Sequence, residues 1–162
     1  MTQATVPTIY APRLVRDDLG VMGRLVAVAI FVAATGVLVL AAYLTPNPAG
    51  SGTHEQLGLR GCQFLQTTGL PCPSCGMTSS FAWFARGNLL ASLYVQPMGA
   101  ALAFLTAVTA WSAIYAALTA RPVYRLLRLL PGRYYLLPLM ALGVFAWGWK
   151  ILIHLNGADG WR

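Results

Sequence analysis

The chain has 162 residues, of which 57% are hydrophobic and only 9% are charged, and its mean hydropathy is +0.63. A soluble domain carries about a quarter charged residues, so this composition predicts that lipid covers much of the surface. It excludes a disordered chain and, with three Cys, a disulfide-dense secreted miniprotein.

The formal net charge of +7 arises from 11 basic residues against four acids. The arginines flank apolar stretches and form no dense patch beside stacking aromatic residues, which argues against nucleic-acid binding. No two acids share an apolar or motif-bearing segment, so paired-carboxylate catalysis has almost no candidates. We assign no catalytic residue, and the composition does not favour an enzyme.

The N-terminal part predicts a polar cytoplasmic leader over residues 1–24 and a first transmembrane helix over residues 25–44. The second range carries no charge and reaches the length of about 20 residues needed to cross a hydrocarbon core. Pro46 and Pro48 end it, because proline cannot continue a helix. We expect an uncleaved anchor, since the apolar run is longer than the core of a signal peptide.

Residues 45–97 form the predicted loop between the first and second spans. Two short apolar stretches follow the cysteine motif, at residues 79–86 and 89–95. Thr78 is expected to cap the first stretch and Gly87 to end it. Neither is long enough to span a membrane, so we expect one or two short amphipathic or re-entrant helices.

The second half of the chain predicts two more spans. Residues 98–120 are uncharged and residues 134–155 nearly so. Between them, residues 121–133 hold four arginines among leucines, a pattern typical of a basic segment on anionic lipid. Residues 156–162 form a C-terminal tail. The expected fold is an all-α integral membrane bundle with three transmembrane helices.

Three polar side chains near the predicted spans have simple membrane interpretations. Lys150 lies near the end of the third span and Arg86 between the short helices, and we expect both to snorkel to the headgroups. His154 shares a helix face with Lys150, but the spans contain no carboxylate that could pair with it, so we expect an interfacial histidine. Trp147 and Trp149 are expected as interfacial anchors.

The distribution of basic residues predicts the orientation. The leader and the Arg-rich loop together hold seven Lys and Arg, whereas the other side holds four. The positive-inside rule then places the N-terminus in the cytoplasm and the cysteines outside it, where disulfides can persist.

A C-P-S-C-G motif at residues 72–76 carries the most distinctive chemistry of the sequence. In a metal knuckle, Pro73 fixes the bend and Gly76 adopts a positive φ so that backbone N–H groups point at sulfur. Cys62 would be a third ligand and His54 a fourth, with zinc as the metal that fits, although the spacing does not enforce this set.

Two further interpretations of the cysteines stay open. Cys72 and Cys75 precede a helix N-terminus, whose dipole would stabilise a thiolate and support redox chemistry. Alternatively, a disulfide within this pair, or from Cys62 to either of them, would be purely structural.

The motif residues also resemble a known family, the domain-of-unknown-function 2752 family of small bacterial membrane proteins. The residues that carry the resemblance are Cys62, Cys72, Pro73, Cys75, Gly76, Thr78, Arg86, Gly87, Asn88, Gln96 and Pro97. Ser79, Asn88 and Gln96 depart from the Arg, Asp and Asn of the family pattern, which is consistent with neutral hydrogen bonds in place of an ion pair. The resemblance implies a bacterial cytoplasmic membrane protein in which the segment after the motif folds against the bundle.

Together these patterns favour a scaffold or partner-binding membrane protein with a structural or disulfide-stabilised cysteine loop. The alternative is a metal-binding or thiol-redox module that uses the three cysteines, and no cofactor other than zinc is implied. The expected partners are the bilayer, anionic lipid at the Arg-rich loop, and another membrane protein or a second copy of the chain.

Overall fold

The computed structural model describes residues 18–121 and 133–161, and within them every regular element is a helix. Three long helices dominate: α1 (Val21–Tyr43), α5 (Pro97–Thr119) and α7 (Arg133–Leu155). Each contains a stretch long and apolar enough to cross a membrane. The predicted all-α architecture with three membrane-spanning helices is confirmed. Residues 1–17 of the leader and 122–132 of the Arg-rich loop lie outside the described residues.

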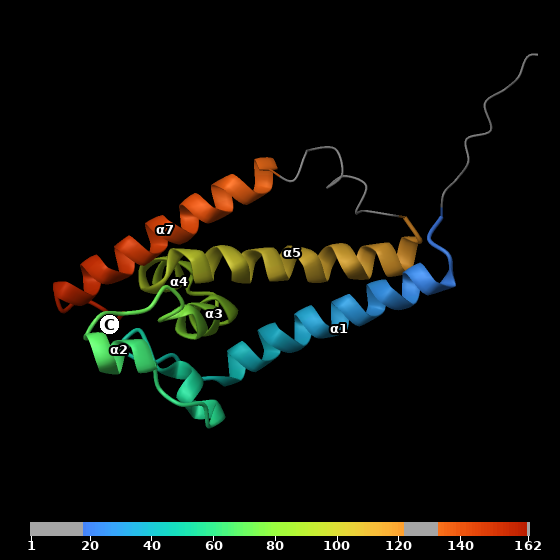
Figure 1. The fold of residues 1–162 in the computed structure, drawn as a ribbon. Helices are drawn as coiled ribbons and strands as arrows, with labels where there is room; N and C mark the ends of the chain where they lie inside the picture. Colours follow the sequence, from blue (N-terminus) through green and yellow to red (C-terminus); the bar gives the residue numbers. More distant parts are fainter. Residues whose placement is uncertain (1–17, 122–132, 162) are drawn as a thin grey trace, which may run out of the picture.

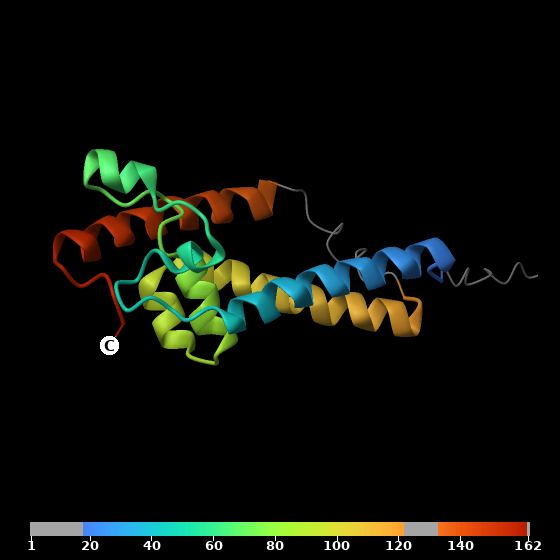
Figure 2. The same ribbon diagram turned by 90° about the horizontal axis from the view of Figure 1, so that it is seen from below.

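The helices α1 and α5 run antiparallel and side by side, whereas α7 lies at an angle to the pair (Figures 1 and 2). Buried alanines line the contact, among them Ala27 on α1 and Ala116 and Ala117 on α5. Small side chains let two helix backbones approach closely in lipid.

The first long helix begins earlier than predicted and takes Arg24 into its first turns. The guanidinium of Arg24 donates hydrogen bonds to the carbonyl oxygens of Ala117 at 3.0 Å and Leu118 at 3.4 Å. These carbonyls lie in the last turn of α5, where the helix dipole favours a cation. The predicted span began after Arg24 because this residue is charged. In the structure, the side chain of Arg24 lies within α1 and joins it to α5.

Four short elements gather where α1 ends and α5 begins (Figure 1). They are η1 (Thr53–Leu57), α2 (Gln63–Thr68), α3 (Met77–Ala85) and α4 (Leu89–Val95). The last two are the short helices expected after the cysteine motif, whereas η1 and α2 were not predicted from the sequence. Helix α3 packs against α1, α4, α5 and η1, so α3, α4 and η1 are attached to the bundle.

Buried serines join α3 to α4. The hydroxyl of Ser80 donates to the carbonyl of Ser92 at 2.9 Å, and the hydroxyl of Ser92 returns a bond to the carbonyl of Ser80 at 2.8 Å. Helix α5 approaches closely as well, because a Cβ on Gly99 would lie 2.8 Å from the Cβ of Ser80. Helices as short as α3 and α4 are only marginally stable by themselves. Buried hydrogen bonds of this kind stabilise them and fix their positions.

One expectation for this region was wrong in detail. Thr78 does not cap α3, because the helix already begins at Met77 and the N-cap position belongs to Gly76. The exposed side chain of Arg86 has a protein acceptor, because its Nη2 donates to the carbonyl of Leu44, the C-cap of α1, at 3.2 Å. Gly87 follows α3 with a φ of 81°, as expected of a helix terminator.

Candidate metal centre

The structure brings the three cysteines together. The Sγ atoms of Cys62, Cys72 and Cys75 all lie within 4.8 Å of one another, although Cys62 belongs to a different segment from the other two. Cys75 is buried and the others are half-buried, and all three thiols are free. The Sγ atoms of Cys72 and Cys75 are 3.0 Å apart. Three of the four predicted ligands therefore converge on one point.

The cysteine motif forms a tight turn directly ahead of α3. The backbone N–H of Cys75 bonds to the carbonyl of Cys72 at 3.0 Å, and that of Met77 bonds to the carbonyl of Ser74 at 3.1 Å. Gly76 has a φ of 85°, and a Cβ there would lie 2.7 Å from the carbonyl oxygen of Gly50. Both the left-handed backbone and the close approach require glycine.

Residues from two long helices hold this turn in place. The side-chain Nε2 of Gln96, at the N-cap of α5, donates to the carbonyl of Pro73 at 2.8 Å, and Gln96 is completely buried. The indole of Trp147 on α7 donates to the carbonyl of Pro71 at 3.0 Å. Trp147 thus has a protein partner in addition to the interfacial role expected of it. The motif is therefore clamped between α5 and α7.

The environment of the thiols separates their acidities. Burial alone would raise the pKa of Cys72, but hydrogen bonds from Ser74 and from the thiols of Cys75 and Cys62 outweigh it and lower that pKa to about 7. Burial raises the pKa of Cys75 well above its ordinary value, and its bonds to the neighbouring thiols raise it further. Cys72 is therefore the first of this pair to form a thiolate.

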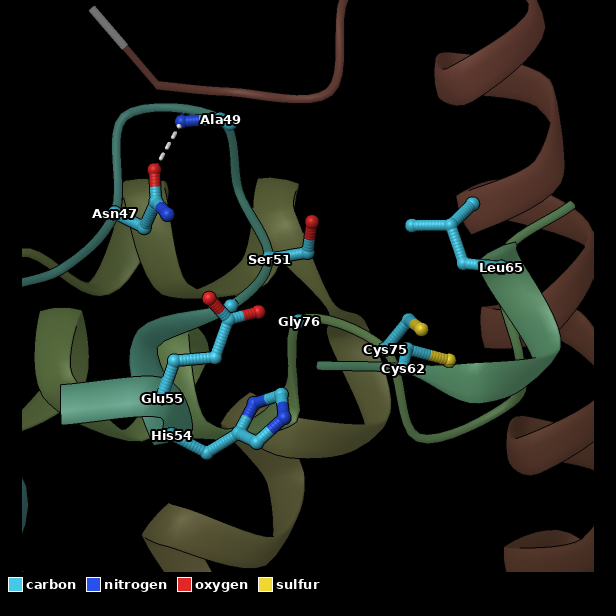
Figure 3. A pocket seen from close by; sticks show the side chains of 10 residues that line it. Asn47, Ala49, Ser51, His54, Glu55, Cys62, Leu65, Cys75 and Gly76 are labelled. Carbon is cyan, nitrogen blue, oxygen red and sulfur yellow. Dashed lines mark hydrogen bonds between the residues drawn. The ribbon is translucent and has the colours of Figure 1, made fainter. Parts of the chain in front are cut away.

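A cavity of about 230 Å³ opens beside the cysteines (Figure 3). Its lining residues are Asn47, Ala49, Ser51, Gly52, His54, Glu55, Cys62, Leu65, Cys75 and Gly76. His54 and Glu55 come from η1, opposite Cys62 and Cys75 in the close view. The Nε2 of His54 contacts the carbonyl of Arg60 at 3.1 Å, and His54 is not part of the group of clustered sulfur atoms. Sequence reasoning missed Glu55, because it lies outside the motif.

A buried ion pair lies behind the turn. Lys150 is only 1% exposed, and its Nζ lies 3.1 Å from Oδ1 of Asp159 and 3.4 Å from the carbonyl oxygen of Gly50. The other carboxylate oxygen of Asp159 contacts Nδ1 of His154. The expectation that Lys150 snorkels was wrong, because the C-terminal tail folds back onto the end of α7. The carboxylate that contacts His154 comes from this tail and not from a span.

Glycines permit the close packing of this tail. A Cβ on Gly50 would lie 1.9 Å from the carbonyl oxygen of Asp159, and one on Gly160 would lie 1.6 Å from that of Pro48. The ring of Tyr94 packs edge-on against Trp161, with ring centroids 5.6 Å apart. The tail therefore occupies one defined position beside the cysteine turn.

The arrangement of the sulfur atoms suits a single metal ion. Zinc binds thiolates at about 2.3 Å in a tetrahedron, which separates neighbouring sulfurs by roughly 3.8 Å. Sulfurs within 4.8 Å of one another reach that spacing with small side-chain rotations. The cavity adjoins two of the three donors, so the described residues supply three thiol ligands and a space beside them.

Comparison with known proteins adds one finding. No match was found among curated proteins or among solved structures. The cysteine turn, α3, α4 and the first part of α5 form the region that carries a family signature. Residues 62–111, which contain all three clustered cysteines, match the family model described as "Protein of unknown function (DUF2752)", and the resemblance seen in the motif is confirmed.

Proposed function

We propose that this chain is a multi-span membrane protein that binds one soft metal ion, expected to be zinc, through Cys62, Cys72 and Cys75. The observation that carries the proposal is the convergence of three free Sγ atoms from two separate segments. A scaffold with a purely structural loop, favoured by the sequence alone, does not require Cys62 to meet the other pair. Thiolates are the ligands that zinc prefers in knuckle motifs.

The protonation of the thiols supports the same proposal. Metal binding requires thiolates and releases protons, so a thiol with a pKa of about 7 is a favourable first ligand. Cys72 would contact the ion first, and the positive charge of the ion would then favour deprotonation of Cys75. Affinity is expected to rise with pH until all three thiols are ionised.

The proposed metal centre faces the side opposite to the N-terminus. The excess of basic residues in the leader and the Arg-rich loop supports a cytoplasmic N-terminus and, with it, cysteines outside the cytoplasm of a bacterial cell. The lipid bilayer surrounds the three long helices.

Metal analysis of the full chain, purified in mild detergent, tests the proposal. We expect about one zinc ion per chain, and loss of most of it in Cys62→Ser and in Cys75→Ser. Ser51→Ala serves as the matched control, because it changes the same cavity and leaves the thiols intact. Titration of the wild-type chain with Co²⁺ covers the case in which a cysteine variant does not fold, since thiolate binding gives a charge-transfer absorption. Three free thiols with no uptake of either metal would overturn the proposal.

The 3.0 Å separation of the Cys72 and Cys75 sulfurs favours a second candidate function. A disulfide between them would stiffen the turn as the binding surface of a scaffold, for another membrane protein or a second copy. Alkylation followed by mass spectrometry separates the two functions. Two cysteines protected until reduction, in a chain without metal, would favour the scaffold.

A further inference from the structure

We propose that the metal centre is open, and that the cavity beside it admits a small aminothiol whose sulfur completes the metal coordination while its ammonium group faces Glu55. The inference rests on the proposed function, because it requires a metal at Cys62, Cys72 and Cys75. It goes further by naming an exchangeable ligand and its chemical class.

The count of protein donors is the first reason. A structural zinc site has four protein ligands, whereas a site with three keeps its fourth position for an external ligand. Among the described residues, the cluster contains three sulfur donors and no further His, Asp or Glu. His54 lies nearby, but its Nε2 contacts the carbonyl of Arg60 at 3.1 Å.

The position and size of the cavity are the second reason. Two of the three donors, Cys62 and Cys75, line it directly, so the space adjoins the proposed metal (Figure 3). Its volume of about 230 Å³ is several times the share of one water molecule, about 30 Å³, yet lies below the range of ordinary drug-sized pockets. A ligand of only a few heavy atoms fits these limits.

The chemistry of the walls selects the ligand class. The turn side offers sulfur and the side chain of Leu65, whereas the opposite side offers the carboxylate of Glu55, together with Asn47. Glu55 is the acid in this lining and is paired with no basic side chain among the described residues. A soft metal prefers a sulfur donor, and the carboxylate complements a cationic amine.

Spectroscopy of the Co²⁺-substituted full chain in detergent tests the inference, because visible absorption of bound Co²⁺ reports its ligands. Three probes separate the contributions: cysteamine has a thiol and an amine, mercaptoethanol has a hydroxyl in place of the amine, and ethanolamine has a hydroxyl in place of the thiol. We expect saturable spectral changes with the two thiols, with tighter binding of cysteamine, and none with ethanolamine.

Two variants locate the ligand. Glu55→Gln should weaken cysteamine binding about two- to fivefold, the factor of one exposed ion pair, and leave mercaptoethanol binding unchanged. Ser51→Phe fills the cavity and should abolish the response to both thiols while Co²⁺ stays bound, with Ser51→Ala as the control.

Several results would overturn the inference. If the absorption spectrum of bound Co²⁺ does not change with any added thiol, the metal has no exchangeable position. A changed Co²⁺ spectrum in His54→Ala would identify His54 as the fourth ligand, and loss of the charge-transfer band on adding thiol would show extraction of the metal. If Co²⁺ gives no thiolate band at all, the proposed function fails, and the inference fails with it.

Discussion

The buried ion pair between Lys150 and Asp159 allows a sharp test of the tail's role. The change Asp159→Asn keeps the shape of the side chain but removes the negative charge that lies 3.1 Å from the ammonium group. Lys150, only 1% exposed, would then keep a buried positive charge, with the carbonyl of Gly50 at 3.4 Å as its remaining hydrogen-bond acceptor among the described residues. An uncompensated buried charge is strongly destabilising.

The structure sets the size of the effect. Removal of one partner from a buried ion pair costs about 3–5 kcal/mol. Asp159 itself is 22% exposed, so water relieves part of the loss, and we expect about 3 kcal/mol. This is a large share of a total stability on the order of 5–15 kcal/mol. Lys150→Met removes the charge itself, so the double variant should regain about 2 kcal/mol relative to Asp159→Asn.

Unfolding of the purified chain in mixed micelles with increasing dodecyl sulfate, followed by circular dichroism, measures these differences. Asn156→Ala is a suitable control, because Asn156 is an exposed residue of the same tail. If Asp159→Asn falls within 0.5 kcal/mol of the wild type, roughly the range of a neutral surface change, Lys150 reaches water and the argument is refuted. Equal stabilities of Asp159→Asn and the double variant would also refute it.

Three further predictions concern the cysteine turn and its supports. In metal-free, reduced protein, iodoacetamide should alkylate Cys72 at a rate that rises with pH and is half-maximal near pH 7, because the thiolate forms above the pKa of about 7. Cys75 should react slowly at every pH, and equal alkylation rates of the two cysteines at pH 7, measured by mass spectrometry, would contradict the prediction. Gly50→Ala should lower the free energy of unfolding by more than about 2 kcal/mol, because its Cβ would lie 1.9 Å from a carbonyl oxygen. The control Gly58→Ala, also at positive φ but in open space, should lower it by about 1 kcal/mol. Similar losses of stability in the two variants, measured by thermal unfolding, would argue against the packed tail. Gln96→Leu should destabilise the chain by about 1–2 kcal/mol and weaken zinc binding, because the carbonyl of Pro73 loses its hydrogen-bond donor. Unchanged zinc affinity in a competition assay would show that the cysteine turn keeps its geometry without this hydrogen bond.

The sequence predicted the long helices well because their signal is local. Length and hydropathy of a continuous stretch identify a span without knowledge of its neighbours, and all three spans are present. The start of α1 was less predictable, because Arg24 is satisfied by carbonyls at the end of α5, far away in the chain. The short helix α2 was hidden for a similar reason, since six residues are too few to show a helical period.

The surroundings of the cysteines were less predictable, because they depend on contacts between distant segments. In the sequence, Glu55 and Asp159 lie in neither a span nor the cysteine motif. The sequence therefore indicated that no carboxylate lies near the cysteines. In the fold, Glu55 lines the cavity and Asp159 neutralises Lys150 behind the turn. The motif itself identified the three thiols, but only the fold shows that Cys62 reaches the other two.

The three departures from the family pattern show why a motif comparison alone misjudges roles. Considered together, Ser79 and Asn88 suggested neutral hydrogen bonds in place of one lost ion pair, and Gln96 a further change from the family pattern. The structure gives each a different partner: Ser79 bonds to the hydroxyl of Thr53 at 2.7 Å, Asn88 caps α4, and Gln96 bonds to the cysteine turn. These side chains therefore fix η1, α4 and the turn separately. Because η1 carries His54 and Glu55, the Thr53–Ser79 bond also sets the distance between the cavity wall and the thiols.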